Sequence, residues 1–178
     1  HEAANRVFTN AVYLAVGFAV CFVLAGIFLP GAILTLFGAE GDVFRLAKTY
    51  LRVILLFAPA FLMNNLFLCF VRNDGEPQRS MTAMIVGSLS NVVLDWVFIF
   101  PCGMGMFGAA FATGLAPIIS MAVLSPHVIR RRNGFHFIKC RMQGRLAAAI
   151  LSSGVPSLVT EVSSGVVIIV FIAIIMRL

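Results

Sequence analysis

Charged residues are rare along this chain, and their spacing leaves five long apolar stretches. A helix that spans a membrane needs about 20 predominantly apolar residues, and each stretch can supply one. No stretch shows the strict alternation of apolar and polar residues that is typical of a strand. The pattern therefore predicts an all-α, polytopic membrane bundle of about five transmembrane helices. The expected spans cover about residues 8–29, 46–70, 80–100, 107–124 and 146–176.

Turn residues separate the expected spans. The segments LPGA, RNDGEPQR (residues 72–79) and PCGMGMFG contain the Gly, Pro and Asp that favour tight turns. Pro59 falls inside the second span, where its ring removes a backbone donor and clashes with the preceding turn, so we expect a kink there. A basic segment, HVIRRRNGFHFIKCRMQGR (residues 127–145), precedes the fifth span.

Composition places the chain among integral membrane proteins. It is 61% hydrophobic and 11% charged, whereas an ordinary soluble domain carries about 25% charged residues. The sequence begins at His1 without an initiator Met and stops directly after an apolar run, so we expect a fragment of a longer protein. The four cysteines lie far apart without metal-ligand spacing, which indicates small apolar fillers.

The basic residues predict how the helices are oriented. Nine Lys and Arg lie on the side of residue 1 and of the 127–145 linker, and four lie on the other side. Cytoplasmic loops carry the excess of Lys and Arg. Residue 1 and the linker are therefore expected on the cytoplasmic side of the cytoplasmic membrane. The net charge of +6 comes mostly from this linker, so it indicates membrane topology and lipid headgroups rather than nucleic acid.

Polar residues inside the spans are the candidates for function. Asp95 lies in the apolar run SNVVLDWVFIF, where an ionised carboxylate costs roughly 3 kcal/mol or more. Asn91 lies four residues earlier and therefore shares a helix face with Asp95. No basic residue lies near Asp95 in its own helix, which favours a functional carboxylate over a structural ion pair or a buried protonated acid.

For the other polar residues inside the spans, both a structural and a functional interpretation are open. Thr113 lies in a stripe of small residues that predicts close helix packing, and such hydroxyls more often join helices than bind ligands. Asn64 and Asn65 are adjacent, so at most one can face the bundle interior squarely. Glu161 lies in a helix rich in hydroxyls, which can solvate its carboxylate.

Residues 70–114, FVRNDGEPQRSMTAMIVGSLSNVVLDWVFIFPCGMGMFGAAFATG, resemble the multidrug and toxic compound extrusion (MATE) family. That family shows an Arg and a Gly-x-Pro turn, an Asn-x-x-x-Asp helix, a Gly-rich turn and Gly-Ala-Ala-x-Ala-Thr. A weaker similarity covers nearly the whole chain. The resemblance implies helices 3 to 7 of a twelve-helix antiporter. Residues 1–126 would then be a partial N-terminal lobe of four helices, 127–145 the cytoplasmic inter-lobe linker, and 146–178 the first helix of the C-terminal lobe.

The resemblance also implies roles for individual residues. Some branches of the family hold a cation in the N-terminal lobe, and their Asn and Asp on helix 5 and Thr on helix 6 match Asn91, Asp95 and Thr113. Their Asn on helix 4 matches either Asn64 or Asn65. Other branches place an essential Glu on helix 7, about one turn beyond Glu161, which is kept as a candidate substrate or cation contact.

The function implied is cation-coupled export, driven by H⁺ or Na⁺, of organic and often cationic compounds. No cofactor is expected besides the coupling ion, for which Asp95, Asn91 and Thr113 would be the ligands if it is Na⁺. The expected partners are small organic substrates and membrane lipids, without nucleic acid, and the full-length protein is expected to be a monomer. The alternatives are a lipid-linked oligosaccharide flippase of the same superfamily and a non-transporting structural membrane subunit.

An intramembrane enzyme is disfavoured by the residue types present. An aspartyl protease needs two membrane aspartates, and the expected spans contain only Asp95. A serine protease needs a general base such as His inside the membrane. His1, His127 and His136 are all expected in loops, so no enzymatic activity is expected.

Overall fold

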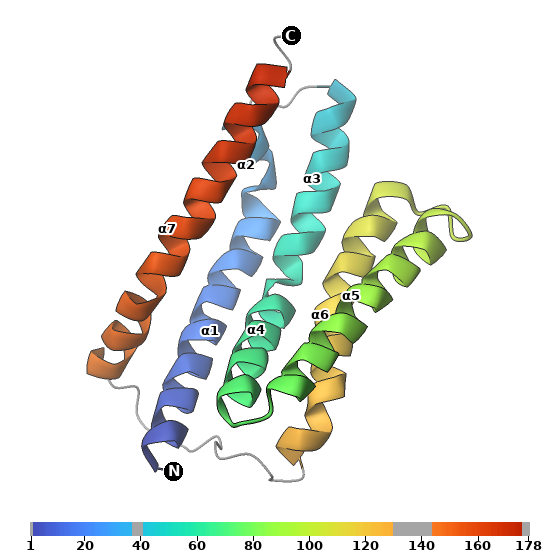
Figure 1. The fold of residues 1–178 in the computed structure, drawn as a ribbon. Helices are drawn as coiled ribbons and strands as arrows, with labels where there is room; N and C mark the ends of the chain where they lie inside the picture. Colours follow the sequence, from blue (N-terminus) through green and yellow to red (C-terminus); the bar gives the residue numbers. More distant parts are fainter. Residues whose placement is uncertain (1, 37–40, 130–143, 176–178) are drawn as a thin grey trace. The chain divides into compact units, whose positions relative to one another are not determined.

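The computed structural model describes residues 2–36, 41–129 and 144–175, and all regular structure in these ranges is helical (Figure 1). The expected all-α class is confirmed. Residues 1–140 form one compact unit, with α1 to α6, and residues 141–178 form a second, with α7. The helices are α1 Glu2–Phe28, α2 Pro30–Leu36, α3 Gly41–Leu56, α4 Ala58–Asn73, α5 Pro77–Ile99, α6 Gly105–Ile129 and α7 Gly144–Ile175.

Four described helices are individually long and apolar enough to cross a membrane, and α3 with α4 makes a fifth candidate as a bent pair. The prediction of about five spans is therefore confirmed. The four single spans are Ala4–Phe28, Pro77–Ile99, Gly105–His127 and Gly144–Ile168. Several helices are longer than the apolar stretches expected from the sequence. Residues beyond the end of an apolar stretch can remain helical although they are polar. α6 reaches Ile129 and α7 begins at Gly144, so both enter the stretch expected as linker.

The expected kink is present in the second span. α3 and α4 meet at a bend of 50°, with Phe57 between them and Pro59 in the first turn of α4. Pro59 has no N–H for the preceding turn, so the regular ladder is interrupted there. The ring of Phe57 lies at the bend and packs edge-on against Phe111 of α6, with the ring centroids 5.7 Å apart.

Short turns join α4 to α5 and α5 to α6. Gly75, in the turn between α4 and α5, has a φ of +87°, and Gly103, between α5 and α6, has a φ of +62°. Only glycine adopts such values without strain, which explains its presence at both turns. The segment LPGA was expected only as a turn, but Pro30 is the first residue of the short helix α2. Proline is favoured there because its missing N–H has no partner within the helix.

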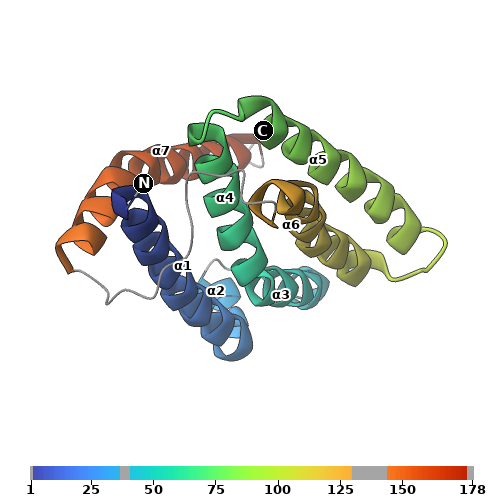
Figure 2. The same cartoon turned by 90° about the horizontal axis from the view of Figure 1, so that it is seen from below.

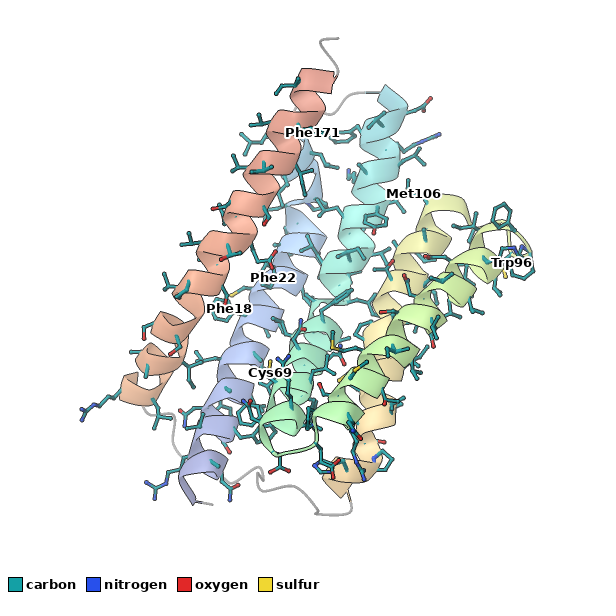
Figure 3. The ribbon with its side chains drawn as sticks, in the orientation of Figure 1. Phe18, Phe22, Cys69, Trp96, Met106 and Phe171 are labelled. Atoms are coloured by element: carbon teal, nitrogen blue, oxygen red, sulfur yellow. The ribbon has the colours of Figure 1, made fainter. Side chains whose placement is uncertain are left out.

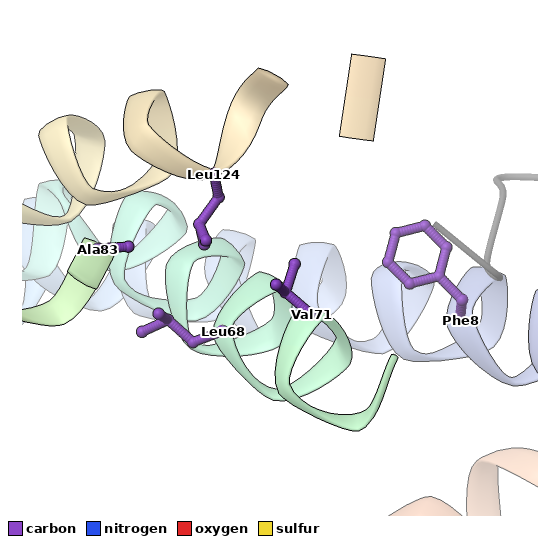
Figure 4. Close-up of a cluster of buried hydrophobic side chains, with 5 residues drawn as sticks. All are labelled: Phe8, Leu68, Val71, Ala83 and Leu124. Carbon is purple, nitrogen blue, oxygen red and sulfur yellow. The ribbon is translucent and has the colours of Figure 1, made fainter. Parts of the chain in front are cut away.

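Helix α4 has a central place in the first unit. It contacts α1 on one side and both α5 and α6 on the other (Figure 2). A cluster of buried apolar side chains from these four helices holds them together, with Val71 and Ala83 fully buried (Figure 4). The other members of the cluster are Phe8, Leu68 and Leu124.

Many large apolar side chains face outward. Phe18, Phe22 and Trp96 have exposed fractions of 47%, 43% and 61% (Figure 3). In water such a surface would be a liability. In a bilayer, lipid tails cover it, so the distribution of side chains supports a membrane-embedded protein.

The position of His127 differs from the loop expected for it. It lies in the last turns of α6 with an exposed fraction of 2%, and its Nε2 lies 3.1 Å from Asp74 Oδ2 at the end of α4. The apolar run ends near Leu124, but α6 continues past it, and His127 is the last residue of the candidate span Gly105–His127. His127 is therefore a buried helix residue at the end of the bundle, away from the middle of the spans.

Candidate functional site: a polar cavity between α4, α5 and α6

A cavity of about 440 Å³ opens between the middle parts of α4, α5 and α6. Its wall contains amide and hydroxyl groups but no basic side chain. The packing of α4 against both α5 and α6 brings these groups together (Figure 2). The lining residues are Phe61, Asn64, Asn65, Leu68, Met84, Gly87, Ser88, Asn91, Val92, Thr113, Ala116, Pro117 and Ser120.

Two residues singled out from the sequence meet in this cavity. Asn91 Nδ2 donates a hydrogen bond to Thr113 Oγ1 across α5 and α6, at 3.5 Å. This distance lies beyond the usual range for N–H to O bonds, so the contact is weak. The Thr113 hydroxyl donates to the carbonyl of Ala109 at 2.9 Å. Its remaining acceptor capacity therefore points toward Asn91 and the cavity.

Asp95 lies one helical turn beyond Asn91 and is half-buried. Its Oδ1 is buried without a hydrogen-bond partner, and none of the ion pairs found among the described residues includes Asp95. A buried carboxylate oxygen without a partner is costly. A proton or a bound cation would remove that cost. Asp95 does not itself line the cavity, so it lies beside the cavity on the Asn91 face of α5.

The adjacent asparagines of α4 both line the cavity, but they differ in burial. Asn64 is half-buried and Asn65 is exposed. Asn64 Oδ1 is buried and has no hydrogen-bond partner. Asn64 is therefore the better placed of the two to accept a hydrogen bond or bind a cation inside the bundle.

Glu161 lies on α7, in the second unit, and its side chain is exposed. The cavity is built without it. No group of three or more His, Cys, Asp or Glu side chains comes together within the described residues. A cation held near the cavity would therefore be bound by amide, hydroxyl and carbonyl oxygens with the single carboxylate of Asp95.

Ser120 is a cavity residue that was not among the candidates predicted from the sequence. It is seven residues after Thr113, which places both on one face of α6. Its exposed fraction is 2%, and its hydroxyl has no hydrogen-bond partner. The sequence signal was the spacing of seven from Thr113, but a serine among small residues is normally interpreted as packing.

The sequence of the chain is similar to a family model and to known export proteins. The MatE family model matches residues 1–97. The chain is 25% identical over 158 residues to the multidrug export protein MepA of Staphylococcus saprophyticus, covering 88% of this chain and 35% of that protein. It is 21% identical over 167 residues to MepA of Staphylococcus aureus strain MSSA476, covering 93% and 37%.

The fold of the chain is also similar to solved transporter structures. An inward-facing multidrug resistance MATE transporter of the MOP superfamily matches with a TM-score of 0.79 at 29% identity, over 88% of this chain and 36% of that one. A MOP superfamily transporter from Pyrococcus furiosus, whose binding pocket is described as reversed in polarity, matches with a TM-score of 0.83 at 27% identity, over 93% and 37%. The chain spans slightly more than a third of the length of these relatives.

Proposed function

The chain belongs to the MatE family of multidrug efflux transporters, and from this premise we propose that the protein containing it is a cation-coupled antiporter that exports organic, often cationic, compounds across the cytoplasmic membrane. The coupling ion is H⁺ or Na⁺. The observation that carries the proposal is the buried, unpartnered Oδ1 of Asp95 beside a polar cavity. A lone carboxylate inside a membrane bundle is a functional group by default.

Loading of Asp95 by a cation supplies the coupling. A proton or a metal cation at Asp95 would supply the partner that its buried Oδ1 lacks. Asn91 can donate a hydrogen bond to the carboxylate, and the amide and hydroxyl oxygens of Asn91 and Thr113 can bind Na⁺. Neutralisation of Asp95 then favours one arrangement of the helices over another. A coupled conformational change requires such a differential affinity.

The lining of the cavity supports an organic, cationic substrate. Its apolar members, among them Phe61 and Met84, can contact an aromatic ring, and its polar members are amides and hydroxyls. A lipid-linked oligosaccharide carries phosphate groups and would favour basic side chains in the cavity. The described lining has none, so a flippase is the less supported alternative. A non-transporting subunit would leave the unpartnered carboxylate without a role.

The proposal also covers the orientation of the protein in the membrane, its oligomeric state and its cofactors. Residue 1 and the linker 127–145 face the cytoplasm, in keeping with the excess of Lys and Arg on that side. The full-length protein works as a monomer among membrane lipids and uses no cofactor besides the coupling ion. Glu161 is proposed as a secondary contact for substrate or cation from α7.

Binding of a fluorescent organic cation to the purified full-length transporter tests the proposal. We expect saturable binding that is displaced by protons or by Na⁺, because the cation and the drug favour different states of one site. K⁺ at equal ionic strength is the control for general salt effects, because it is neither a proposed coupling ion nor an organic cation. Binding that neither protons nor Na⁺ displace would contradict cation coupling, and absence of saturable binding would contradict export of organic cations.

A further inference from the structure

Ser120 differs from several other hydroxyls in the described helices. Those of Thr82 and Thr113 donate to the carbonyl four residues earlier, at 2.8 and 2.9 Å, and that of Ser125 donates to Ala122 O at 2.7 Å. Such back-bonding is the usual way in which a buried hydroxyl is satisfied inside a helix. The hydroxyl of Ser120 is buried and makes no such bond.

The room around Ser120 comes from Gly87 on α5. A Cβ built on Gly87 would lie 3.1 Å from Ser120 Cβ and 3.7 Å from its Oγ. α5 and α6 therefore approach closely at this point, and Gly87 itself places no side chain over the hydroxyl. Both residues line the cavity, so the unpartnered hydroxyl belongs to a residue of the cavity wall.

Two further oxygens belong to residues of the same cavity lining. Asn64 Oδ1 of α4 is buried without a hydrogen-bond partner and belongs to the same lining as Ser120. Pro117, one turn before Ser120, has no N–H, so it cannot donate the bond that the Thr113 carbonyl accepts in a regular helix. Buried acceptors without donors are rare in proteins and indicate a missing partner.

We propose that Ser120 Oγ and Asn64 Oδ1 form a subsite that accepts hydrogen bonds from an N–H group of the transported compound, such as an ammonium or a guanidinium. The subsite is separate from Asp95: Ser120 does not serve the coupling ion and instead selects among substrates. A donor on the compound fits both unpartnered atoms, because an amide oxygen only accepts hydrogen bonds and a hydroxyl oxygen can accept them. This inference rests on the proposed export of organic cations.

The chemistry of the subsite predicts a difference between two kinds of cation. A primary ammonium has three N–H donors, whereas a fully methylated quaternary ammonium has the same charge and none. Loss of the Ser120 hydroxyl therefore affects only the first kind. The loss of one hydrogen bond corresponds to about a three- to tenfold weaker affinity.

Calorimetric titration of the purified full-length transporter, at fixed pH and Na⁺ concentration, tests this directly. The two probes are naphthylmethylammonium and its N,N,N-trimethyl counterpart. In Ser120→Ala we expect the dissociation constant of the primary ammonium to rise about three- to tenfold and that of the trimethyl compound to stay unchanged. Ser125→Ala is the matched control, because this serine lies on the same helix with its hydroxyl bonded to Ala122 O and outside the cavity lining; both probes should bind it as they bind the wild type.

The results of this titration distinguish failure of the proposed subsite from failure of the proposed function. Equal weakening of both probes in Ser120→Ala, or no effect on either, would overturn the subsite and leave export untouched. Failure of the wild type to bind either cation would overturn the subsite together with the proposed export of organic cations. If Ser120→Ala does not yield folded protein, Ser120→Cys gives the same comparison, since sulfur keeps the volume but is a weak acceptor.

Discussion

His127 Nε2 lies 3.1 Å from Asp74 Oδ2, and this contact joins the end of α6 to the turn between α4 and α5. The side chains are 3% and 16% exposed, so neither group is well hydrated. The contact fixes two segments that are far apart in sequence at the same end of the bundle. That end also carries Arg72 and Arg79, which the charge count assigns to the same side as the linker.

Replacement of His127 by Ala should destabilise the protein. The change removes a partner of the Asp74 carboxylate and leaves a space where a buried ring was, so we expect a loss of about 1–3 kcal/mol. The loss should appear as a lower midpoint of thermal unfolding in detergent, measured on the full-length protein. Ser125→Ala, two residues earlier, should leave the midpoint close to that of the wild type. An unchanged midpoint in His127→Ala would show that the contact contributes nothing to stability.

The close approach at the α3–α4 bend gives a second stability prediction. A Cβ at Gly114 would collide with the ring of Phe57, so Gly114→Ala should displace the ring or shift α6 and cost about 1–3 kcal/mol. Gly17→Ala is the control, since a Cβ there meets nothing within 4 Å and alanine favours a helix. The ratio of aggregated to monodisperse protein after heating is the measurement. Equal thermal stability of both variants would contradict this account of the bend.

The orientation of the bundle can be tested with cysteines on opposite ends. Native Cys102 is exposed in the turn between α5 and α6, and Gln78 is exposed near the turn between α4 and α5. With all other cysteines removed, Cys102 should react with a membrane-impermeant maleimide in intact cells. Gln78→Cys in a cysteine-free background should react only after the inner face is opened. The reverse pattern would invert the orientation.

Thr113→Ala should slow transport without abolishing it. The change removes one neutral oxygen near the cation and the weak bond from Asn91, but leaves the charge of Asp95 in place. We expect efflux to fall about two- to tenfold, and Thr113→Ser, which keeps the hydroxyl, to remain near the wild type. Initial efflux rates from loaded cells at matched expression give the comparison. Loss as complete as that from removal of the Asp95 charge would assign Thr113 a larger role than one ligand.

The sequence predicted the elements that depend on local chemistry. The apolar stretches predicted the five spans, and Pro59 predicted the bend, because each effect acts within one helix. The approach of Asn91 and Thr113 was implied by the family resemblance, and the structure brings the two side chains together across α5 and α6.

The features that were missed depend on contacts between helices. For Ser120 the sequence offered only its spacing from Thr113, because its significance comes from Gly87 on another helix and from the absence of a back-bond. His127 was expected in a loop because hydropathy marks where the apolar run ends and carries no information on where the helix ends. The difference between Asn64 and Asn65 likewise follows from their burial against neighbouring helices.

The central claim is that Asp95 couples transport to a cation by gaining and losing its charge, and drug efflux by Asp95→Asn tests it most directly. The substitution mimics the protonated acid in shape and fixes the side chain as neutral. Efflux is measured from energised cells or from full-length protein in liposomes with an imposed H⁺ or Na⁺ gradient. Asp42→Asn, which removes the same charge from a carboxylate that is 90% exposed, is the control. The account predicts that gradient-driven efflux is abolished in Asp95→Asn and retained in Asp42→Asn, with both proteins folded. Efflux at the wild-type rate in Asp95→Asn would contradict it and make Asp95 a structural residue.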